Sequence, residues 1–271
     1  MGLDNAVAGG ADIERAMAVA REAAAAAGAA ALRHWRAGVR VERKPDRTPV
    51  TVADREAEAA ALAVIEAAFP DHGILSEESG ARRPDAALRW IVDPLDGTRG
   101  FTRGGPFWGP TVALEREGVI VAGALALPAL GELYWAGRGL GCWRNGERLA
   151  VSVVDDLAAA VLSLGELPRL LEPPHGPGVW RLIQAVETVR AHGDLYAATL
   201  VLTGRADLWL EAGVQVWDIA PLPVLLEEAG GRFTDFAGRP TVASGQAVGS
   251  NGLLHDAVLE YLQAATVATE E

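Results

Sequence analysis

The chain has 271 residues, half of them hydrophobic, which is enough for one large domain or for two small ones that share a broad interface. Its 24 basic and 36 acidic residues give a formal net charge of −12, which disfavours a nucleic-acid partner and suits a protein that gathers carboxylates around cations. The single cysteine, Cys142, excludes a disulfide framework and favours a cytoplasmic location.

The first part of the sequence predicts two helices. Apolar spacing indicates that they cover residues 12–35 and 54–69. The Ala-rich part of the first helix is interrupted by Arg21 and Glu22. We therefore expect it to pack against the protein core, and neither to span a membrane nor to act as a signal peptide.

A sheet is expected after the helices. Between them, Val39 and Val41 indicate an edge-like strand, followed by a polar loop. Short apolar runs then predict strands over residues 73–75, 89–92, 111–115, 119–127 and 132–136. The last three are expected to be antiparallel neighbours. Asn145-Gly146 is typical of a hairpin turn.

From about Leu149 onward the pattern changes to alternating strands and helices, which is typical of an α/β arrangement. Strands are expected near Val161 and over residues 206–210, 232–235 and 247–250. Helices are expected over residues 179–186, from Leu195, and over 217–229 and 253–262. We therefore divide the chain into an N-terminal α+β half, residues 1–149, and a C-terminal α/β half, residues 150–271.

One predicted strand ends in two carboxylates. Ile91 and Val92 form its apolar run, and Pro94 cannot continue a central ladder, so the strand is expected to stop between Asp93 and Asp96. Two ionised carboxylates on one bend repel each other unless a cation lies between them. Oxygen ligands select a hard ion such as Mg²⁺ or Mn²⁺. The strand end therefore predicts a metal site.

The next two residues suit an anion. Gly97 lets the backbone approach a ligand closely, and a helical turn that begins at Thr98 would aim free N–H groups at a phosphate. An Asp-Gly pair on its own is also typical of an ordinary turn. The same ambiguity applies to Glu77-Glu78 after a strand and to Asp218 at a helix start, since such acids often only face solvent or complement the helix dipole.

Taken together, three motifs resemble the inositol monophosphatase family of metal-dependent phosphatases. They are Ser-Glu-Glu-Ser at 76–79, Asp-Pro-Leu-Asp-Gly-Thr-Arg-Gly-Phe at 93–101 and Trp-Asp-Ile-Ala at 217–220. The resemblance covers nearly the whole chain and extends to Lys44, Asp54, the Asn145-Gly146 hairpin and the closing residues 250–252. It implies an α/β (α+β) fold, a layered α-β-α-β-α sandwich, and a homodimer.

The resemblance also implies the ligand set. Two or three Mg²⁺, with Mn²⁺ as a substitute, would be held by Glu77, Asp93, Asp96, Asp218 and the backbone carbonyl of Leu95. Thr98 would position a nucleophilic water activated by metal, with Glu77 and Asp96 as further catalytic residues. The N–H groups of Gly97 and Thr98 would bind the phosphate. Lys44 and Asp54 are expected on a mobile loop that completes the metal site. The N-terminal half would thus carry most ligands, and the C-terminal half Asp218 and the substrate pocket.

Two positions depart from the family pattern. Gly100 stands where family members commonly have Asn before the Phe, and Ser76 stands where they have Gly before the Glu pair. Neither change removes a ligand. The glycine is expected to loosen the helical turn after the phosphate site.

Within the family, residues 101–108, 189–194 and 252–256 are most similar to the bacterial histidinol-phosphate phosphatases. Glu211 matches a position that contacts the alcohol part of the substrate, and Asp194 is expected to face the same pocket. Two carboxylates there would bind the ammonium group of L-histidinol phosphate. Asp194 is equally well explained as a helix N-cap. Inositol 1-phosphate and, for a nucleotide 3′-phosphatase, adenosine 3′,5′-bisphosphate are the alternative substrates.

Other mechanisms are less well supported. Cys142 and Arg148 have the spacing of cysteine-dependent phosphatases, but the Asn145-Gly146 turn between them indicates a hairpin and not a phosphate-binding loop. An aspartyl-phosphate mechanism would need an Asp-x-Asp motif, whereas residues 93–96 have Asp-x-x-Asp. The five histidines lack metal-ligand spacing, and His34, His72 and His255 are expected at the surface or at helix caps. A regulatory protein that binds a macromolecule is the alternative class, although the sequence names no such partner.

Overall fold

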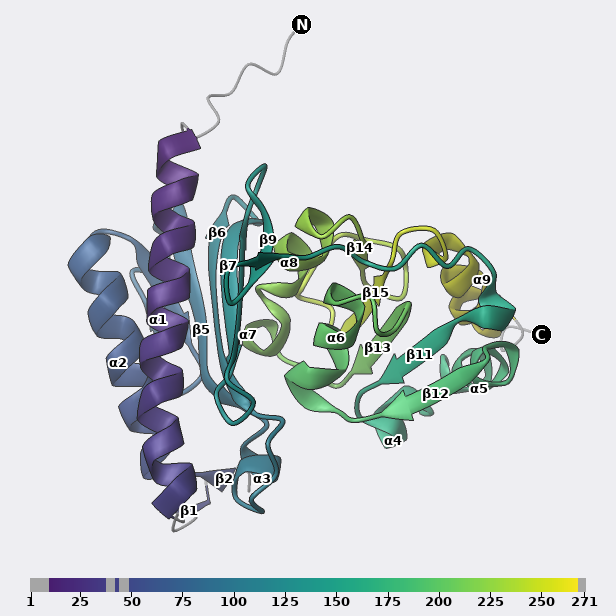
Figure 1. Ribbon diagram of the computed structural model, residues 1–271, viewed down its shortest axis with the longest axis horizontal. Coiled ribbons are helices and arrows are strands. Elements are labelled where there is room, and N and C mark those ends of the chain that lie inside the picture. The colour runs from purple at the N-terminus through teal and green to yellow at the C-terminus, as the bar shows by residue number, and fades with distance from the viewer. Residues whose placement is uncertain (1–9, 38–41, 44–48, 268–271) are drawn as a thin grey trace, which may run out of the picture.

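The computed structural model describes residues 10–37, 42–43 and 49–267, and its main body consists of two large β-sheets layered with helices (Figure 1). The outer helices on the first sheet are α1 (Gly10–Ala37) and α2 (Val52–Ala68). The helices between the two sheets are α6 (Asp194–Leu202), α7 (Val216–Ile219) and α8 (Leu222–Glu228). Those on the outer face of the second sheet are α4 (Leu167–Leu170), α5 (Gly176–Ala185) and α9 (His255–Val267). The predicted α-β-α-β-α sandwich is confirmed.

The first sheet has eight strands in the order β10-β9-β8-β7-β6-β5-β3-β4. In chain order they are β3 (Gly73–Ser76), β4 (Gly80–Arg82), β5 (Leu88–Asp96), β6 (Gly109–Arg116), β7 (Val119–Leu127), β8 (Glu132–Gly137), β9 (Gly141–Arg144) and β10 (Glu147–Arg148). Only β3 and β5 pair in parallel; the other neighbours are antiparallel. The predicted antiparallel strands β6, β7 and β8 are therefore confirmed, and β5 lies inside the sheet with a partner on each side.

The second sheet has five strands in the order β12-β11-β13-β15-β14. They are β11 (Val161–Leu164), β12 (Thr188–Ala191), β13 (Leu208–Ala212), β14 (Arg232–Thr234) and β15 (Gln246–Ser250). Strand β11 is parallel to both β12 and β13. Parallel strands start at the same end of a sheet, so the connections between these strands cross over through helices. The remaining pieces are β1 (Glu42–Arg43) with β2 (Pro49–Val50), the short α3 (Thr98–Phe101) and a 3₁₀ turn, η1 (Leu157–Ala159).

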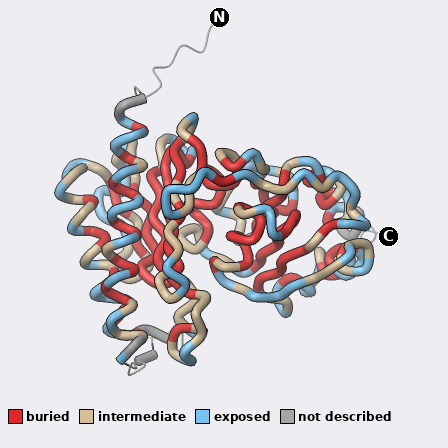
Figure 2. Tube along the Cα trace, in the orientation of Figure 1, coloured by how far each residue is buried: buried red, intermediate tan, exposed pale blue. Residues whose placement is uncertain are grey.

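Three hydrophobic cores separate the layers, and Figure 2 shows the buried residues concentrated on the strands and on the inner helix faces. The side chains of β5 point alternately to the two faces of the sheet and so contribute to two of these cores. Trp90 and Val92 pack beneath α1 and α2, while Ile91 faces the helices between the sheets. Fully buried alanines on α1 let that helix lie close to the strands. Of the helices in the described part of the chain, none is long and apolar enough to cross a membrane.

Local sequence signals explain several element boundaries. The Asn145-Gly146 turn adopts φ of 50° and 90°, the left-handed conformation of a type I′ hairpin, as predicted. The prediction of one continuous helix over 217–229 is wrong, because the segment is divided into α7 and α8 at Pro221. Proline has no N–H for the carbonyl of Trp217, and that carbonyl instead accepts the hydroxyl of Thr111 at 2.6 Å. The strands β4 and β12 were not predicted. The strand expected at residues 39 and 41 lies outside the described residues.

The division of the chain at residue 149 stays a prediction. The strands of the first sheet end at Arg148 and those of the second begin at Val161. Helices from the C-terminal part nevertheless pack against the first sheet, because α6 and α8 share one hydrophobic core with its strands.

His255 was expected at the surface or at a helix cap, but it is fully buried. Its Nε2 lies 2.8 Å from the hydroxyl of Thr234 and its Nδ1 lies 2.8 Å from the hydroxyl of Ser250. The hydroxyl of Thr234 donates its own proton to the carbonyl of Asp235 at 2.8 Å, so it accepts from Nε2, and Ser250 donates to Nδ1. A neutral imidazole satisfies both partners, and burial lowers the pKa of His255 to about 4.

Replacing His255 with Gln should remove a pH-dependent part of the stability. The folded-state pKa of about 4 lies below the ordinary 6.5, so the unfolded chain takes up this proton first as the pH falls. The contribution of neutral His255 is complete above pH 6.5 and declines by roughly 3 kcal/mol as the pH falls to about 4. Urea unfolding should show a larger difference between wild type and His255→Gln at about pH 7 than at about pH 4.5. A difference that is constant with pH would contradict the buried neutral imidazole.

Candidate active site

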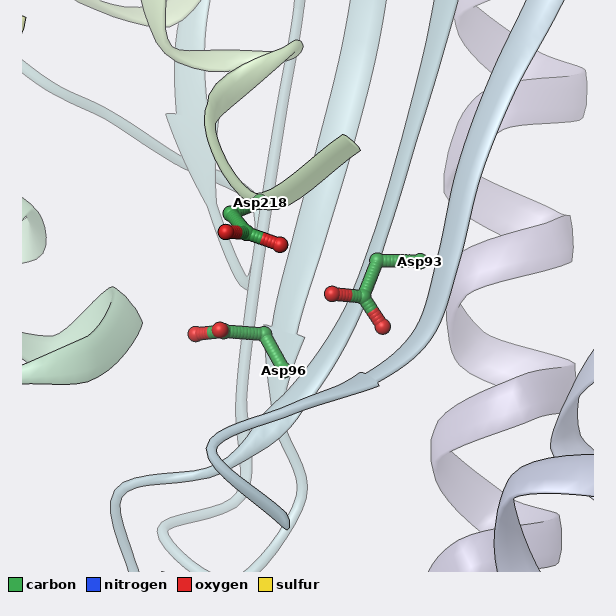
Figure 3. A group of neighbouring side chains, drawn as sticks. All are labelled: Asp93, Asp96 and Asp218. Atoms are coloured by element: carbon green, nitrogen blue, oxygen red, sulfur yellow. The ribbon is translucent and has the colours of Figure 1, made fainter. Parts of the chain in front are cut away.

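Three aspartates from two elements meet at one place. Asp93 and Asp96 come from the end of β5 and Asp218 from α7, and Figure 3 shows the three carboxylates gathered around a common space. One oxygen of each lies within 4.8 Å of the other two. Asp93 is buried, whereas Asp96 and Asp218 are partly exposed. Acids predicted at separate strand and helix ends are thus brought into one cluster.

A β-bulge aligns Asp93 with Asp96. The strand was expected to stop between them, but β5 continues to Asp96 and its register against β6 shifts there. Pro94 and the residue after it lie opposite a single residue of β6, so the missing N–H of the proline falls outside the regular ladder. Residues three apart on a regular strand face opposite sides of a sheet. The extra residue therefore places both carboxylates on the same side.

Backbone amides hold the three carboxylates in place. Asp93 accepts the N–H of Leu95 at 2.8 Å, Asp96 that of Leu195 at 3.1 Å, and Asp218 that of Gln215 at 2.7 Å. The last bond is half of a capping box, because Asp218 is the third residue of α7 and Gln215 is its N-cap. In each case one oxygen is anchored by the backbone, which leaves the other for a ligand in the common space.

The cluster is electrostatically unfavourable without a cation. Burial, and then repulsion from Glu77, Asp96 and Asp218, raises the pKa of Asp93 well above its ordinary value. Burial and neighbouring acids have the same effect on the pKa of Asp96, and burial raises the pKa of Asp218 to about 6. A hard divalent cation would relieve this repulsion, and a donor set made only of oxygen atoms fits such an ion.

The turn after the aspartates has the conformation expected of an anion site. Gly97 has φ of 79°, and α3 begins at the next residue, with the N–H of Phe101 donating to the carbonyl of Gly97 at 2.9 Å. The N–H groups of a first helical turn have no partner within the helix. The helical turn begins at Thr98, as the sequence predicted, and phosphate binding by the N–H groups of Gly97 and Thr98 stays a prediction.

Thr98 links this turn to Asp54. Its hydroxyl lies 3.0 Å from the carbonyl of Leu95 and 3.3 Å from Oδ1 of Asp54. Asp54 was expected on a mobile loop, but it is a buried residue in the first turn of α2, where its Oδ2 accepts the N–H of Thr51 at 2.7 Å. That capping box fixes the carboxylate. Lys44, predicted beside it, lies outside the described residues.

The aspartate cluster opens into a cavity of about 620 Å³. Every residue that was assigned to the site, apart from Asp54 and Lys44, lines this cavity: Glu77, Asp93, Leu95, Asp96, Gly97, Thr98, Asp194, Glu211 and Asp218. The first six come from the end of the first sheet, and the last three from α6, β13 and α7. The cavity therefore lies where strand ends of the two sheets meet.

Asp194 and Glu211 are the acids expected at the alcohol end of the substrate. Asp194 begins α6, but the N-cap is Gly193 and the N–H of Leu195 in the first turn donates to Asp96, so the N-cap interpretation of Asp194 is wrong. Its carboxylate instead lies over the turn formed by Gly97 and Thr98, because a Cβ built on Gly97 would lie 3.2 Å from Oδ2 of Asp194. Desolvation raises the pKa of Asp194 to about 6 and that of Glu211 to about 8.

Other cavity residues were not predicted from the sequence. Glu166 and Arg169 follow the end of β11, Arg99 lies in α3, and Trp209 precedes Glu211 by two residues and so shares its face of β13. The one signal for Glu166 was its position shortly after the strand predicted near Val161. Because β11 and β13 are parallel neighbours, the ends of both strands supply residues to the same cavity.

Cys142 takes no part in this site. It is fully buried on β9, and burial raises its pKa to about 12. Arg148 lies on β10, across the hairpin from it and not in a phosphate-binding loop. The structure therefore argues against the cysteine-dependent mechanism.

The two departures from the family pattern are accommodated. The hydroxyl of Ser76 bonds to the carboxylate of Glu58, which also accepts the N–H of Ser79 at 3.0 Å and so fixes the backbone on either side of the glutamate pair. At Gly100 the helical turn is still formed, and a Cβ there would lie 3.7 Å from Oδ2 of Asp194.

Comparisons with known proteins agree with this geometry. The pattern of the inositol monophosphatase family matches residues 12–267. The histidinol-phosphatase of Mycobacterium tuberculosis is 40% identical over 231 residues, which are 83% of this chain and 89% of that protein. Nus factor SuhB of Pasteurella multocida is 36% identical over 220 residues, 79% and 82% of the two chains. The solved inositol monophosphatase of Anabaena aligns with a TM-score of 0.83 at 31% identity, covering 93% and 97%.

The fold and the site define a phosphoric monoester hydrolase, from a family that is metal-dependent and acts on small phosphorylated substrates. The chain belongs to the inositol monophosphatase family.

Replacing Asp96 with Asn should stabilise the metal-free protein. Because the folded-state pKa of Asp96 is raised, its charge opposes folding above the ordinary pKa of 3.8, and an amide removes that cost. We expect thermal unfolding in EDTA at neutral pH to move up by about 2 °C or more, and the gain to shrink as the pH falls toward 3.8. Added Mg²⁺ should stabilise the variant less than wild type.

The matched control is Asp256→Asn, which changes an exposed aspartate on α9 and should keep the wild-type response to Mg²⁺. A variant Asp96→Asn that is less stable than wild type in EDTA would argue that the aspartates do not repel one another.

Proposed function

We propose that the protein is a Mg²⁺-dependent phosphomonoesterase whose substrate is a small phosphorylated alcohol, L-histidinol phosphate. One observation carries this proposal: a single cavity is lined by the crowded aspartates, by the turn at Gly97 and Thr98, and by two further acids, Asp194 and Glu211. Similarity to a histidinol-phosphatase over most of the chain supports the choice of substrate.

The metal end uses residues that fit a hard cation. Asp93, Asp96, Asp218, Glu77 and the carbonyl of Leu95 would hold two or three Mg²⁺, with Mn²⁺ as a substitute. When bound, the metal neutralises the phosphate, lowers the pKa of a water and supports the leaving alkoxide. The chain contributes fixed positions, because backbone amides hold the three aspartates before any ligand arrives.

Thr98 and its neighbours orient the reactants. The Thr98 hydroxyl lies between the carbonyl of Leu95 and the carboxylate of Asp54, which places its oxygen to accept a proton from, and so to orient, the attacking water. The N–H groups of Gly97 and Thr98 bind the phosphate oxygens. Lys44 is proposed to act with Asp54 at the same end of the site.

The alcohol end selects the substrate by charge. Glu211 is buried, and its pKa of about 8 means that it is largely protonated when the cavity holds no cation. An ammonium group would lower that pKa and form a charge-assisted hydrogen bond with the carboxylate, with Asp194 as a second acceptor. Inositol 1-phosphate and adenosine 3′,5′-bisphosphate, which lack an ammonium group, are the alternatives.

We propose further that the protein works as a cytoplasmic homodimer without a membrane or nucleic-acid partner. The net charge of −12 would repel a polyanion, and the family resemblance supports the dimer. A regulatory binding role is the alternative class, since one relative is named as a Nus factor. The enzyme is favoured because a protein that only binds a macromolecule has no need for crowded buried carboxylates.

Metal removal and thiol alkylation should have opposite effects. EDTA should eliminate phosphate release and excess Mg²⁺ should restore it, because the reaction depends on the cation held by the aspartates. Iodoacetamide should leave activity unchanged, since Cys142 is buried and has a negligible thiolate fraction. Phosphate release from L-histidinol phosphate is the measurement. Activity that survives EDTA but is lost on alkylation would revive the cysteine-dependent mechanism.

Glu211→Gln should discriminate among substrates. If Glu211 binds the ammonium group, the variant should lose about 1.5–3 kcal/mol of transition-state stabilisation with L-histidinol phosphate, the usual contribution of a charge-assisted hydrogen bond. We would measure kcat/KM with this substrate, inositol 1-phosphate and adenosine 3′,5′-bisphosphate. The control Glu147→Gln changes an exposed glutamate on β10. A wild-type preference for inositol 1-phosphate, or an equal loss on all three substrates, would refute histidinol phosphate as the substrate. The assignment as a phosphatase would not be affected.

A further inference from the structure

The carboxylate of Glu211 lies directly on the backbone of Gly165, where β11 ends. A Cβ built on Gly165 would be 1.5 Å from Oε2, 1.8 Å from Cδ and 2.0 Å from Oε1 of Glu211. These are the three nearest atoms, and each is far inside van der Waals contact. The carboxylate therefore occupies the space that any side chain at position 165 would need.

Conformation does not explain a glycine at this position. Gly165 is not among the residues with positive φ, so its backbone geometry is open to other amino acids. Its N–H donates to the carbonyl of Leu210 at 2.9 Å, which continues the pairing of β11 with β13. What the position requires is the absence of a side chain beneath Glu211.

The close approach lets the backbone hold the carboxylate. Oε1 of Glu211 accepts the N–H of Glu166 at 2.7 Å and the N–H of Ala212 at 3.3 Å. The first of these donors follows Gly165 directly, so it is within reach only because the glutamate can lie flat against the glycine. Glu211 is 5% exposed and still lines the cavity, so the bonds fix one oxygen and leave the carboxylate facing the substrate space.

We propose that Gly165 is a positioning residue that sets the place of the Glu211 carboxylate and thereby the affinity for the alcohol end of the substrate. This rests on the proposed function in that Glu211 is taken to bind the ammonium group of the substrate. An alanine at 165 would displace the carboxylate from the Glu166 N–H without changing its charge, while the aspartates and the phosphate turn keep their positions.

The test is a double-mutant cycle of Gly165→Ala and Glu211→Ala. In wild type, Gly165→Ala should raise KM for L-histidinol phosphate about tenfold or more, the effect of losing a charge-assisted hydrogen bond, and should change kcat far less. In the Glu211→Ala background the same alanine should have no further effect. A merely structural role for Gly165 would give equal losses in the two backgrounds, and that result would overturn the proposal.

The melting temperatures of the same variants provide a second measurement for this cycle. If Gly165→Ala unfolds the protein too readily for kinetics, then adding Glu211→Ala should restore the melting temperature of the Glu211→Ala single variant, because the nearest obstructing atoms are gone. Failure to restore it would overturn the proposal. Gly28→Ala is the control for general overpacking: its Cβ would lie 2.8 Å from Pro128 on the far side of the first sheet, and KM should not change.

The cycle separates this inference from the proposed function. If wild type prefers inositol 1-phosphate but the two substitutions remain non-additive, the substrate assignment is wrong and the role of Gly165 stands. If wild type prefers L-histidinol phosphate and the two losses multiply, the role of Gly165 is wrong and the substrate assignment stands.

Discussion

Mutual repulsion among Asp93, Asp96 and Asp218 is the constraint on which the rest of the structure depends. Carboxylates this close, one buried and two partly buried, destabilise the fold when no cation lies between them, so the surrounding elements must hold them against their own repulsion. Strand β5 does so from inside a sheet that is covered on both faces, and α7 is tied to the same sheet by the bond between Thr111 and the carbonyl of Trp217. The stability supplied by three hydrophobic cores makes the unfavourable cluster tolerable.

The two sheets contribute different parts of the chemistry. The first sheet ends in most of the proposed metal ligands and in the turn at Gly97 and Thr98, which would serve any phosphomonoester. The second sheet and α6 supply Glu211, Glu166 and Asp194 to the same cavity, and in the proposed function Glu211 binds the alcohol part of the substrate. Substrate preference can therefore change at the ends of β11, β13 and α6 while the reaction stays the same, which is how one fold serves several substrates.

Sequence alone predicted the site better where the signal is local. Asp93, Asp96 and Gly97 follow a buried strand directly, and their clustering could be read from that pattern. The bulge could not, because Pro94 equally indicates a strand end until the register against β6 is known. Asp218 could be linked to the cluster only through the family resemblance. The contact between Glu211 and the Gly165-Glu166 backbone joins residues about 45 positions apart, and no local pattern encodes it.

The charged residues that line the cavity favour a substrate that carries charges of both signs. The crowded aspartates suit a cation, and Asp194 and Glu211 add further carboxylates to the same cavity, so the proposed substrate, which carries both a phosphate and an ammonium group, would match its charges. A neutral alcohol would leave Glu211 protonated, as its pKa of about 8 favours, and the carboxylic acid could then only exchange hydrogen bonds with hydroxyl groups. In the proposed function Glu211 would therefore bind either kind of alcohol but would form a charge-assisted hydrogen bond only with the cationic one, which predicts a graded and not an absolute preference.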